Sequence, residues 1–172
     1  MESSSTTSIR IAQVLGVTTA GFYTGAVFHQ YLNLVPAYLV QPAKPAISRW
    51  YGMHIWSKHN LAPAALVGLL SNAFLVVRYH SLPAERVVLG DMTTFRKWKA
   101  YTLATLCIAS FIPFTAKVML PINLVLEDYH RGKATISDAD AKALLVAWRK
   151  KSVVRAWPVG FAAIIGLVIA LS

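Results

Sequence analysis

The sequence predicts an all-α integral membrane protein, a four-helix bundle with short interfacial helices in its loops. Of its 172 residues 56% are hydrophobic, and the mean hydropathy is +0.50, which is more apolar than is usual for a soluble domain of this size. Four apolar runs each have the length that a helix needs to cross the hydrocarbon layer. None of them shows the polar and apolar alternation of a barrel strand, so helices are the predicted elements.

The four predicted spans form one domain that follows a flexible N-terminus, residues 1–8. The first span comes after the polar stretch "MESSSTTSIRIAQ" and outlasts the apolar core of a signal peptide, so we expect it to be retained. Within the domain, residues 9–172, the spans are expected at about residues 11–35, 61–77, 101–121 and 153–171.

Small residues at every fourth position indicate where the first two spans pack closely. Gly16 in the first span and Gly68 in the second belong to such stripes, and small side chains let helix backbones approach one another. Asn72 lies on the same face as Gly68, so we expect it to point toward a neighbouring helix rather than toward lipid, where its amide would be unsatisfied. There it holds either a helix or a ligand.

The loops contain further helical segments. Between the first and second spans, "PAKPAISRWYGMHIWSKHN" places Trp50 and His54 at helical spacing, and its aromatic residues favour the headgroup layer. Asn60 is placed to cap the second span. Before the fourth span, "TISDADAKALLVAWRKK" predicts an amphipathic helix with Ser137 as its N-cap. This helix either ends in the loop or continues into the fourth span until Pro158 bends it.

Composition and motifs exclude several classes of function. The net charge is +10, but the 17 Lys and Arg residues gather in the short segments between the spans, so we expect no nucleic-acid partner. Cys107 is the single cysteine, which excludes an intramolecular disulfide and a CxxC site. The five histidines include no pair four residues apart, and HExxH, GxGxxG, GxSxG and Walker motifs are absent. We therefore expect no metal and no tightly bound cofactor.

Two ionisable residues inside the spans are candidates for a functional site. Lys117 lies within the third span, where an unpaired charge costs about 2.5 to 3.5 kcal/mol. At 100° per residue it shares a face with Ser110 and Pro121, which favours an inward position; alternatively, its long stem reaches the membrane interface. His29 ends the first span on the same face as Gly25, which again allows an inward position or an interfacial one.

Several stretches of the chain carry a family resemblance. The third span ends in "PFTAKVMLPIN", the stretches "AGFYTGAVFHQYLNLVPAYL" and "RWYGMHIWSKHNLAPA" precede it, and Trp148 with Arg155 forms a W-x6-R pattern before the last span. In this order they resemble the landmarks of the anthrone oxygenase family, also called domain of unknown function 1772, over nearly the whole chain. Ile122 stands where the family often has threonine, and Ser152 where asparagine or histidine is common.

The resemblance implies a membrane-bound monooxygenase of aromatic polyketide biosynthesis, a part of secondary metabolism. It would oxidise the methylene of a hydrophobic anthrone to the anthraquinone with O2 and no cofactor, and we expect it in an endomembrane, the endoplasmic reticulum. The anthrone position between the aromatic rings is acidic, and the enolate formed there can pass an electron to O2 directly. The protein then supplies a base, a cation and a dry aromatic slot.

Each of these parts has candidates in this chain. The candidate catalytic residues are His29 as the base and Lys117 and Arg155 as the cationic stabilisers. The candidate substrate-binding residues are Tyr23, Trp50, His54, Asn72, Phe114 and Asn123. In this hypothesis the asparagines donate to substrate oxygens, the aromatic residues line the slot, and His54 is the alternative base.

Two other functions are compatible with the same residues. The base and the cation would also serve a cyclisation or isomerisation of a related polyketide without O2. Alternatively, the chain is a non-catalytic membrane partner that presents substrate to pathway enzymes, which its basic clusters beside the lipid bilayer would support. The sequence leaves the oligomeric state open.

Overall fold

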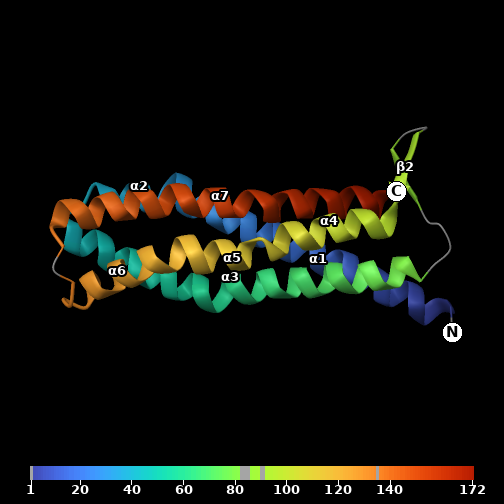
Figure 1. Ribbon diagram of the computed structural model, residues 1–172, viewed down its shortest axis with the longest axis horizontal. Helices are drawn as coiled ribbons and strands as arrows, with labels where there is room; N and C mark the ends of the chain where they lie inside the picture. The colour runs from blue at the N-terminus through green and yellow to red at the C-terminus, as the bar shows by residue number, and fades with distance from the viewer. Residues whose placement is uncertain (1, 82–85, 90–91, 135) are drawn as a thin grey trace. The chain divides into compact units, whose positions relative to one another are not determined.

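Four long apolar helices make up the structure of this chain, a computed structural model that describes residues 2–81, 86–89, 92–134 and 136–172 (Figure 1). The stretches long and apolar enough to cross a membrane are Thr6–Leu39, Ala43–His80, Lys97–His130 and Asp138–Leu171. Many large apolar side chains on these helices are exposed, as expected for a surface that lipid covers. The helices confirm the predicted all-α class with four spans and indicate a multi-pass membrane protein.

The first span is one continuous helix of three segments: α1 (Glu2–His29), the π-helical η1 (Gln30–Leu34) and α2 (Val35–Leu39). Residues 2–8, which we expected to be flexible, are helical, since extending an existing helix adds one hydrogen bond per residue. At the end of η1, the N–H of Val35 donates to the carbonyl of Gln30, five residues back. Pro36, which has no N–H, follows directly.

The second span, α3 (Ala43–His80), is a single helix of 38 residues. It includes the stretch that we expected to form a separate interfacial helix. Trp50 in this stretch is fully buried, so the stretch packs into the protein core instead of lying at the interface. Asn60 does not cap a helix, because its Nδ2 donates to the carbonyl of Trp56 at 2.8 Å. Pro63 lies inside α3 without ending it.

A short β-hairpin follows α3, in a region for which the sequence predicted only a basic loop. Its strands, β1 (Arg86–Leu89) and β2 (Met92–Arg96), pair in antiparallel orientation. Val88 lies opposite Thr93, and an irregularity in the pairing falls between Arg86 and Val88. The hairpin is a small addition to a helical fold.

The third span also consists of consecutive segments: α4 (Lys97–Ala109), α5 (Phe111–Phe114), η2 (Thr115–Met119) and α6 (Leu120–His130). The π-helical η2 ends as η1 does. The N–H of Leu120 donates to the carbonyl of Thr115, five residues back, and Pro121 follows. Because a π turn holds one residue more than an α turn, side chains before and after it are rotated relative to a count of 100° per residue.

The fourth span, α7 (Asp138–Leu171), is a helix of 34 residues that begins in the preceding loop. Ser137 caps it as predicted, accepting a hydrogen bond from the N–H of Asp140 at 3.1 Å. Pro158 lies inside the helix. Of the two arrangements expected for the amphipathic segment, the one continuous with the fourth span is confirmed.

The backbone divides into two compact units, which we describe separately. Unit 1 contains residues 1–23, 64–110 and 158–172, and unit 2 contains residues 24–63 and 111–157. In unit 1, the rings of Tyr79 and Tyr101 stack with their centres 5.5 Å apart. The side-chain amide of Gln13 donates to both hydroxyl groups, at 3.3 and 3.0 Å. This partly buried polar contact ties α1, α3 and α4 together in unit 1.

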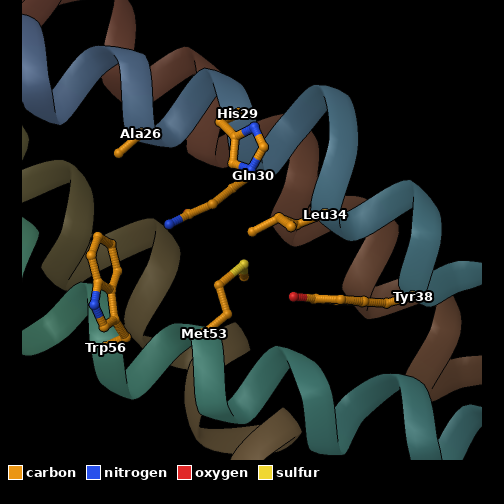
Figure 2. A pocket seen from close by; sticks show the side chains of 7 residues that line it. All are labelled: Ala26, His29, Gln30, Leu34, Tyr38, Met53 and Trp56. Carbon is orange, nitrogen blue, oxygen red and sulfur yellow. The ribbon is translucent and has the colours of Figure 1, made fainter.

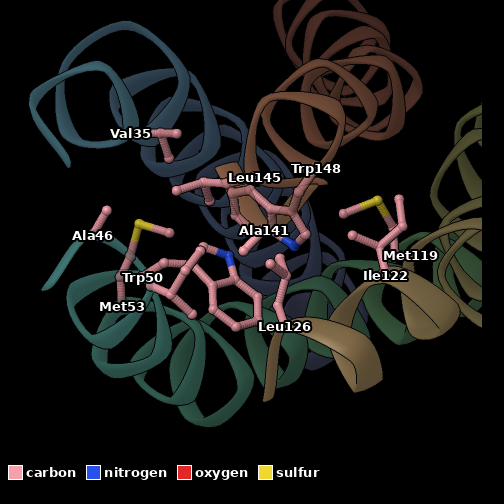
Figure 3. Close-up of a cluster of buried hydrophobic side chains, with 11 residues drawn as sticks. Val35, Ala46, Trp50, Met53, Met119, Ile122, Leu126, Ala141, Leu145 and Trp148 are labelled. Carbon is pink, nitrogen blue, oxygen red and sulfur yellow. The ribbon is translucent and has the colours of Figure 1, made fainter. Parts of the chain in front are cut away.

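Unit 2 holds a core of buried apolar side chains from the first span, α3, η2, α6 and α7 (Figure 3). Its members are Val35, Ala46, Ile47, Trp50, Met53, Met119, Ile122, Leu126, Ala141, Leu145 and Trp148. Trp50 and Trp148 meet edge to face, with ring centres 5.9 Å apart and ring planes at 83°. These two indoles are the largest side chains of the core, and each has a polar neighbour: His54 beside Trp50 and Asn123 beside Trp148.

Candidate functional site

A histidine and a carboxylate lie together in unit 2. His54 of α3 and Glu127 of α6 approach to 3.3 Å between Nε2 and Oε1, and their side chains are 14% and 21% exposed. The imidazole also stacks on the indole of Trp50, with ring centres 5.0 Å apart and planes at 8°. When the Nε2–H donates to the carboxylate, the other ring nitrogen, Nδ1, keeps a lone pair that can accept a proton.

Arg155 of α7 brings a positive charge to the same unit. Its Nη1 donates to Oγ1 of Thr115 at 3.2 Å, and its guanidinium carbon lies 5.3 Å from the ring centre of Phe111. Arg155 is close enough to His54 for their charges to interact. We call His54, Glu127 and Arg155 the polar cluster: an imidazole, a carboxylate and a guanidinium.

Two indoles and an amide lie beside the polar cluster. The Nε1–H of Trp148 donates to Oδ1 of Asn123 at 2.8 Å, a bond that is buried. Trp148 contacts Trp50, on which His54 stacks. Trp50, His54, Asn123 and Arg155, four of the predicted site residues, thus lie in one unit. Phe114, another predicted residue, is partly buried and packs against the same core.

Two buried donors near the polar cluster have no hydrogen-bond partner among the described residues. They are Nε1 of Trp50 and Oγ of Ser152, and both residues are almost completely buried. In Figure 3 the indole nitrogen of Trp50 points into the core. Ser152 lies one helical turn from Trp148 and one from Arg155, on the same face of α7. Because an unpaired buried polar atom is costly, these donors are candidates to bind oxygen atoms of a ligand.

Lys117 does not face inward. Its side chain is exposed, so of the two positions that the sequence left open the inward one is wrong, and the one in which its stem extends toward the interface stays a prediction. The error has a physical cause. Lys117 lies in η2, and the extra residue of this π turn invalidates the count that placed Lys117 on one face with Ser110 and Pro121. The charges of Lys58 and Arg155 both act on His54; Lys58 is exposed, whereas Arg155 is partly buried.

His29 lies at a pocket in unit 2, formed by the first span and α3 (Figure 2). The pocket has a volume of about 360 Å³. Its lining residues are Ala26, His29, Gln30, Leu34, Tyr38, Met53 and Trp56. His29 itself is exposed, and its Nδ1 lies 3.1 Å from Nδ2 of Asn33. The predicted base His29 therefore belongs to this pocket, whereas the alternative base His54 belongs to the polar cluster.

Tyr23 and Asn72 belong to unit 1, unlike the other predicted site residues. Both are buried. Nδ2 of Asn72 donates to the carbonyl of Gly68 at 2.8 Å, and a Cβ added at Gly16 would lie 3.0 Å from the same nitrogen. Asn72 thus fills the space that a glycine leaves on the facing helix. Of the two roles expected for Asn72, the structure supports the one in helix packing.

Glu127, Thr115 and Ser152 lie in or beside this candidate site but were not among the residues predicted from the sequence. One signal was available for Glu127: the chain has only seven Asp and Glu residues, and the third stretch able to span a membrane, Lys97–His130, contains two of them, Glu127 and Asp128. Pairing Glu127 with His54 needs the three-dimensional structure, because the two residues lie on different spans. Within the described part of the chain, no group of three His, Cys, Asp or Glu side chains is arranged to hold a metal ion.

The four apolar helices and the polar cluster define a class: a multi-pass membrane protein with a base, a carboxylate and a cation gathered beside buried indoles. The family model for anthrone oxygenase matches residues 50–165, about two thirds of the chain. The chain therefore belongs to the anthrone oxygenase family, which confirms the resemblance seen in its motifs. No curated protein and no solved structure matches it. The matched region includes the whole polar cluster but not His29.

Proposed function

We propose that this protein oxidises an anthrone-type aromatic polyketide to the anthraquinone with O2 and without a cofactor. Membership in the anthrone oxygenase family supports an oxygenase reaction, and the polar cluster offers the groups that this reaction needs. One anthrone and one O2 give one anthraquinone and one water. The methylene carbon loses two hydrogens and gains one oxygen, so the reaction is balanced without another reductant.

In the proposed reaction, the methylene first loses a proton to Nδ1 of His54, which forms the enolate. The enolate passes one electron to O2, and the substrate radical and superoxide then combine at the same carbon. The resulting peroxide takes up the proton. Loss of the second hydrogen of that carbon as a proton, with cleavage of the O–O bond, leaves the ketone and releases water.

The other residues act through charge and hydrogen bonding. Glu127 holds the Nε2 side of His54 and stabilises the imidazolium that forms when His54 accepts the proton. The guanidinium of Arg155 stabilises the negative charge on the enolate and on superoxide. The free donors of Trp50 and Ser152 bind substrate oxygens, and the apolar core around them excludes bulk water.

The observation that carries this proposal is the pairing of His54 with Glu127 beside Trp50. A histidine in an apolar setting is a base only when its tautomer and orientation are controlled, and the 3.3 Å approach of the carboxylate controls both. The indole of Trp50 restricts the plane of the imidazole further.

We place the reaction at an endomembrane, the endoplasmic reticulum, within aromatic polyketide biosynthesis. An anthrone is hydrophobic and concentrates in a bilayer, which suits a catalyst built from membrane-spanning helices. Enzymes that make the polyketide would then be its partners.

Membranes that contain the full-length protein test the proposal directly. They are incubated with an anthrone in air, under nitrogen, and in air with a chelator, while O2 uptake and quinone formation are followed. We expect quinone formation that requires O2, resists the chelator and exceeds the rate of membranes without the protein. A product formed without O2 uptake would indicate a cyclisation or isomerisation instead. Conversion at the spontaneous rate only would favour a non-catalytic partner.

A further inference from the structure

We propose that the pocket between the first span and α3 binds a flat polycyclic aromatic compound that carries a ketone or phenol oxygen. The inference rests on the proposed function and deepens it, because it assigns the part of the site that recognises the rings. The pocket is lined by Ala26, His29, Gln30, Leu34, Tyr38, Met53 and Trp56 (Figure 2). Its volume of about 360 Å³ falls in the range of small-molecule sites, about 300 to 1,000 Å³.

The walls of the pocket suit aromatic rings. In Figure 2, Trp56 and Tyr38 bound the pocket at opposite ends, with Met53 and Leu34 between them. Aromatic side chains pack against flat rings at their faces and edges, and the thioether of methionine also makes favourable contacts with rings. A slot with an aromatic residue at each end selects for length and flatness in its ligand.

The polar atoms of the pocket suit a ligand with an oxygen function. The hydroxyl group of Tyr38 points into the pocket (Figure 2), and it has no hydrogen-bond partner among the described residues. The amide of Gln30, by contrast, is held in place because its Nε2 donates to Oγ of Ser57 at 2.8 Å. Tyr38 can therefore donate to a ketone or accept from a phenol.

The pocket adjoins the proposed base along α3. Met53, which lines the pocket, is the residue before His54, and consecutive Cα atoms are about 3.8 Å apart. Met53 also belongs to the same buried cluster as Trp50, on which His54 stacks. Because successive side chains of a helix point about 100° apart, the pocket and His54 lie on neighbouring faces of the same turn of α3.

Most of the pocket lies outside the region that the family model matches, whereas the polar cluster lies inside it. Five of its seven lining residues precede residue 50, where the family match begins, whereas His54, Glu127 and Arg155 all lie within the matched region. The reacting groups thus come from the part of the chain that defines the family. The ring-binding pocket comes mainly from the first span, which would set the substrate preference of this member.

Titration calorimetry on the full-length protein in lipid nanodiscs, with empty nanodiscs subtracted, tests the pocket without turnover. The probe is a dihydroxyanthraquinone, which is stable in air. Tyr38→Phe should weaken binding about fivefold, the loss expected for one neutral hydrogen bond. Ala26→Phe, which fills the pocket, should weaken binding at least about twentyfold, since it excludes the rings.

Two variants serve as matched controls. Tyr129→Phe removes a hydroxyl elsewhere in unit 2, and Leu32→Phe adds a ring at an exposed position of η1; both should bind as the wild type does. Unchanged affinity in Tyr38→Phe and Ala26→Phe would overturn the proposal. So would displacement of the quinone by a long-chain fatty acid with the same affinity in the wild type and in Tyr38→Phe, because the pocket would then be a slot for lipid tails.

The outcomes separate this inference from the proposed function. Quinone binding that depends on Tyr38, in a protein that does not oxidise an anthrone, would support the pocket and refute the reaction. Oxidation that continues unchanged in both pocket variants, with unchanged quinone affinity, would support the reaction and refute the pocket.

Discussion

At the scale of single residues, the chemistry depends on what surrounds His54. The imidazole is fixed on one side by the carboxylate of Glu127 and on its face by the indole of Trp50. His59, one and a half turns further along α3, is exposed. The two histidines lie on the same helix in different environments, so they form a matched pair for mutagenesis.

His54→Gln should lower the rate of anthrone oxidation by about 10² to 10⁴-fold, the usual contribution of a positioned base. Glutamine keeps a polar side chain of similar length but cannot take up the proton. His59→Gln should retain the wild-type rate. The measurement is O2 uptake by membranes with equal amounts of inserted protein, and equal rates in the two variants would exclude His54 as the base.

The pH dependence of the rate tests the part that Glu127 plays. A base must be unprotonated, so the rate should fall as the pH drops through the range in which histidine takes up a proton. The negative charge of Glu127 favours the imidazolium form. Glu127→Gln should therefore move the acidic limb of the pH–rate profile to lower pH, and it should also lower the maximal rate about tenfold because the ring is held less well. An unshifted acidic limb would show that Glu127 does not act through His54.

Replacing Arg155 and replacing Lys117 should have opposite effects on the oxidation rate: a large loss and almost none. Arg155→Met should lower the oxidation rate about 10²-fold or more, because its guanidinium is a partly buried positive charge that acts on His54, whereas Lys58, the other such cation, is exposed. Lys117→Met should have little effect, because the side chain of Lys117 is exposed. Quinone formation is measured for both variants after membrane insertion has been verified. A large loss for Lys117→Met with none for Arg155→Met would reverse this assignment.

At the scale of helical elements, the two π turns determine which faces meet. Each ends two residues before a proline, and the N–H of the residue between donates to a carbonyl five residues back. In the third span, η2 separates Phe111 from Asn123 and Glu127, and its extra residue sets the rotation of α6 relative to α5. The contacts of α6 with α3 and α7 depend on that rotation.

Single-residue deletions test this role of η2. Removing Ala116, an exposed residue of η2, should convert the π turn to an α turn. The side chains of α6 would then face nearly the same neighbours as in the wild type. Removing Leu124, an exposed residue of α6, should rotate Glu127 by about 100°. We expect the Leu124 deletion to lose at least about 3 kcal/mol of stability, since it disrupts the packing of buried Leu126, and the Ala116 deletion to lose much less. Thermal unfolding in detergent measures both; equal losses would contradict the proposed role of η2.

The same elements show how far a sequence can predict this structure. Apolar length predicted four helices, and Ser137 predicted the start of α7, because both signals are local. The continuation of α3 through the Trp50 segment was not predicted, since it results from burial of that segment against α6 and α7. The positions of Lys117 and Glu127 were missed for a related reason. The position of Lys117 depends on a π turn, which a count of 100° per residue does not include. The position of Glu127 depends on a contact between different spans.

At the scale of the whole molecule, α3 and α7 are longer than a membrane requires. A helix of 38 residues is about 57 Å long, whereas a hydrocarbon layer about 30 Å thick takes up roughly 20 residues. The first part of α3 carries Lys44, Arg49 and Lys58, and the first part of α7 carries Lys142 and a basic run at residues 149–151. These charged ends therefore extend into the headgroup layer and the water beyond it.

His54 falls in the charged part of α3, so we expect the polar cluster, although enclosed by protein, at the depth of the headgroup layer rather than at the bilayer midplane. A catalyst at that depth draws its substrate from molecules dissolved in the leaflet. Its speed then follows the mole fraction of anthrone in the lipid instead of the concentration in the surrounding buffer, and extra empty lipid slows it by surface dilution.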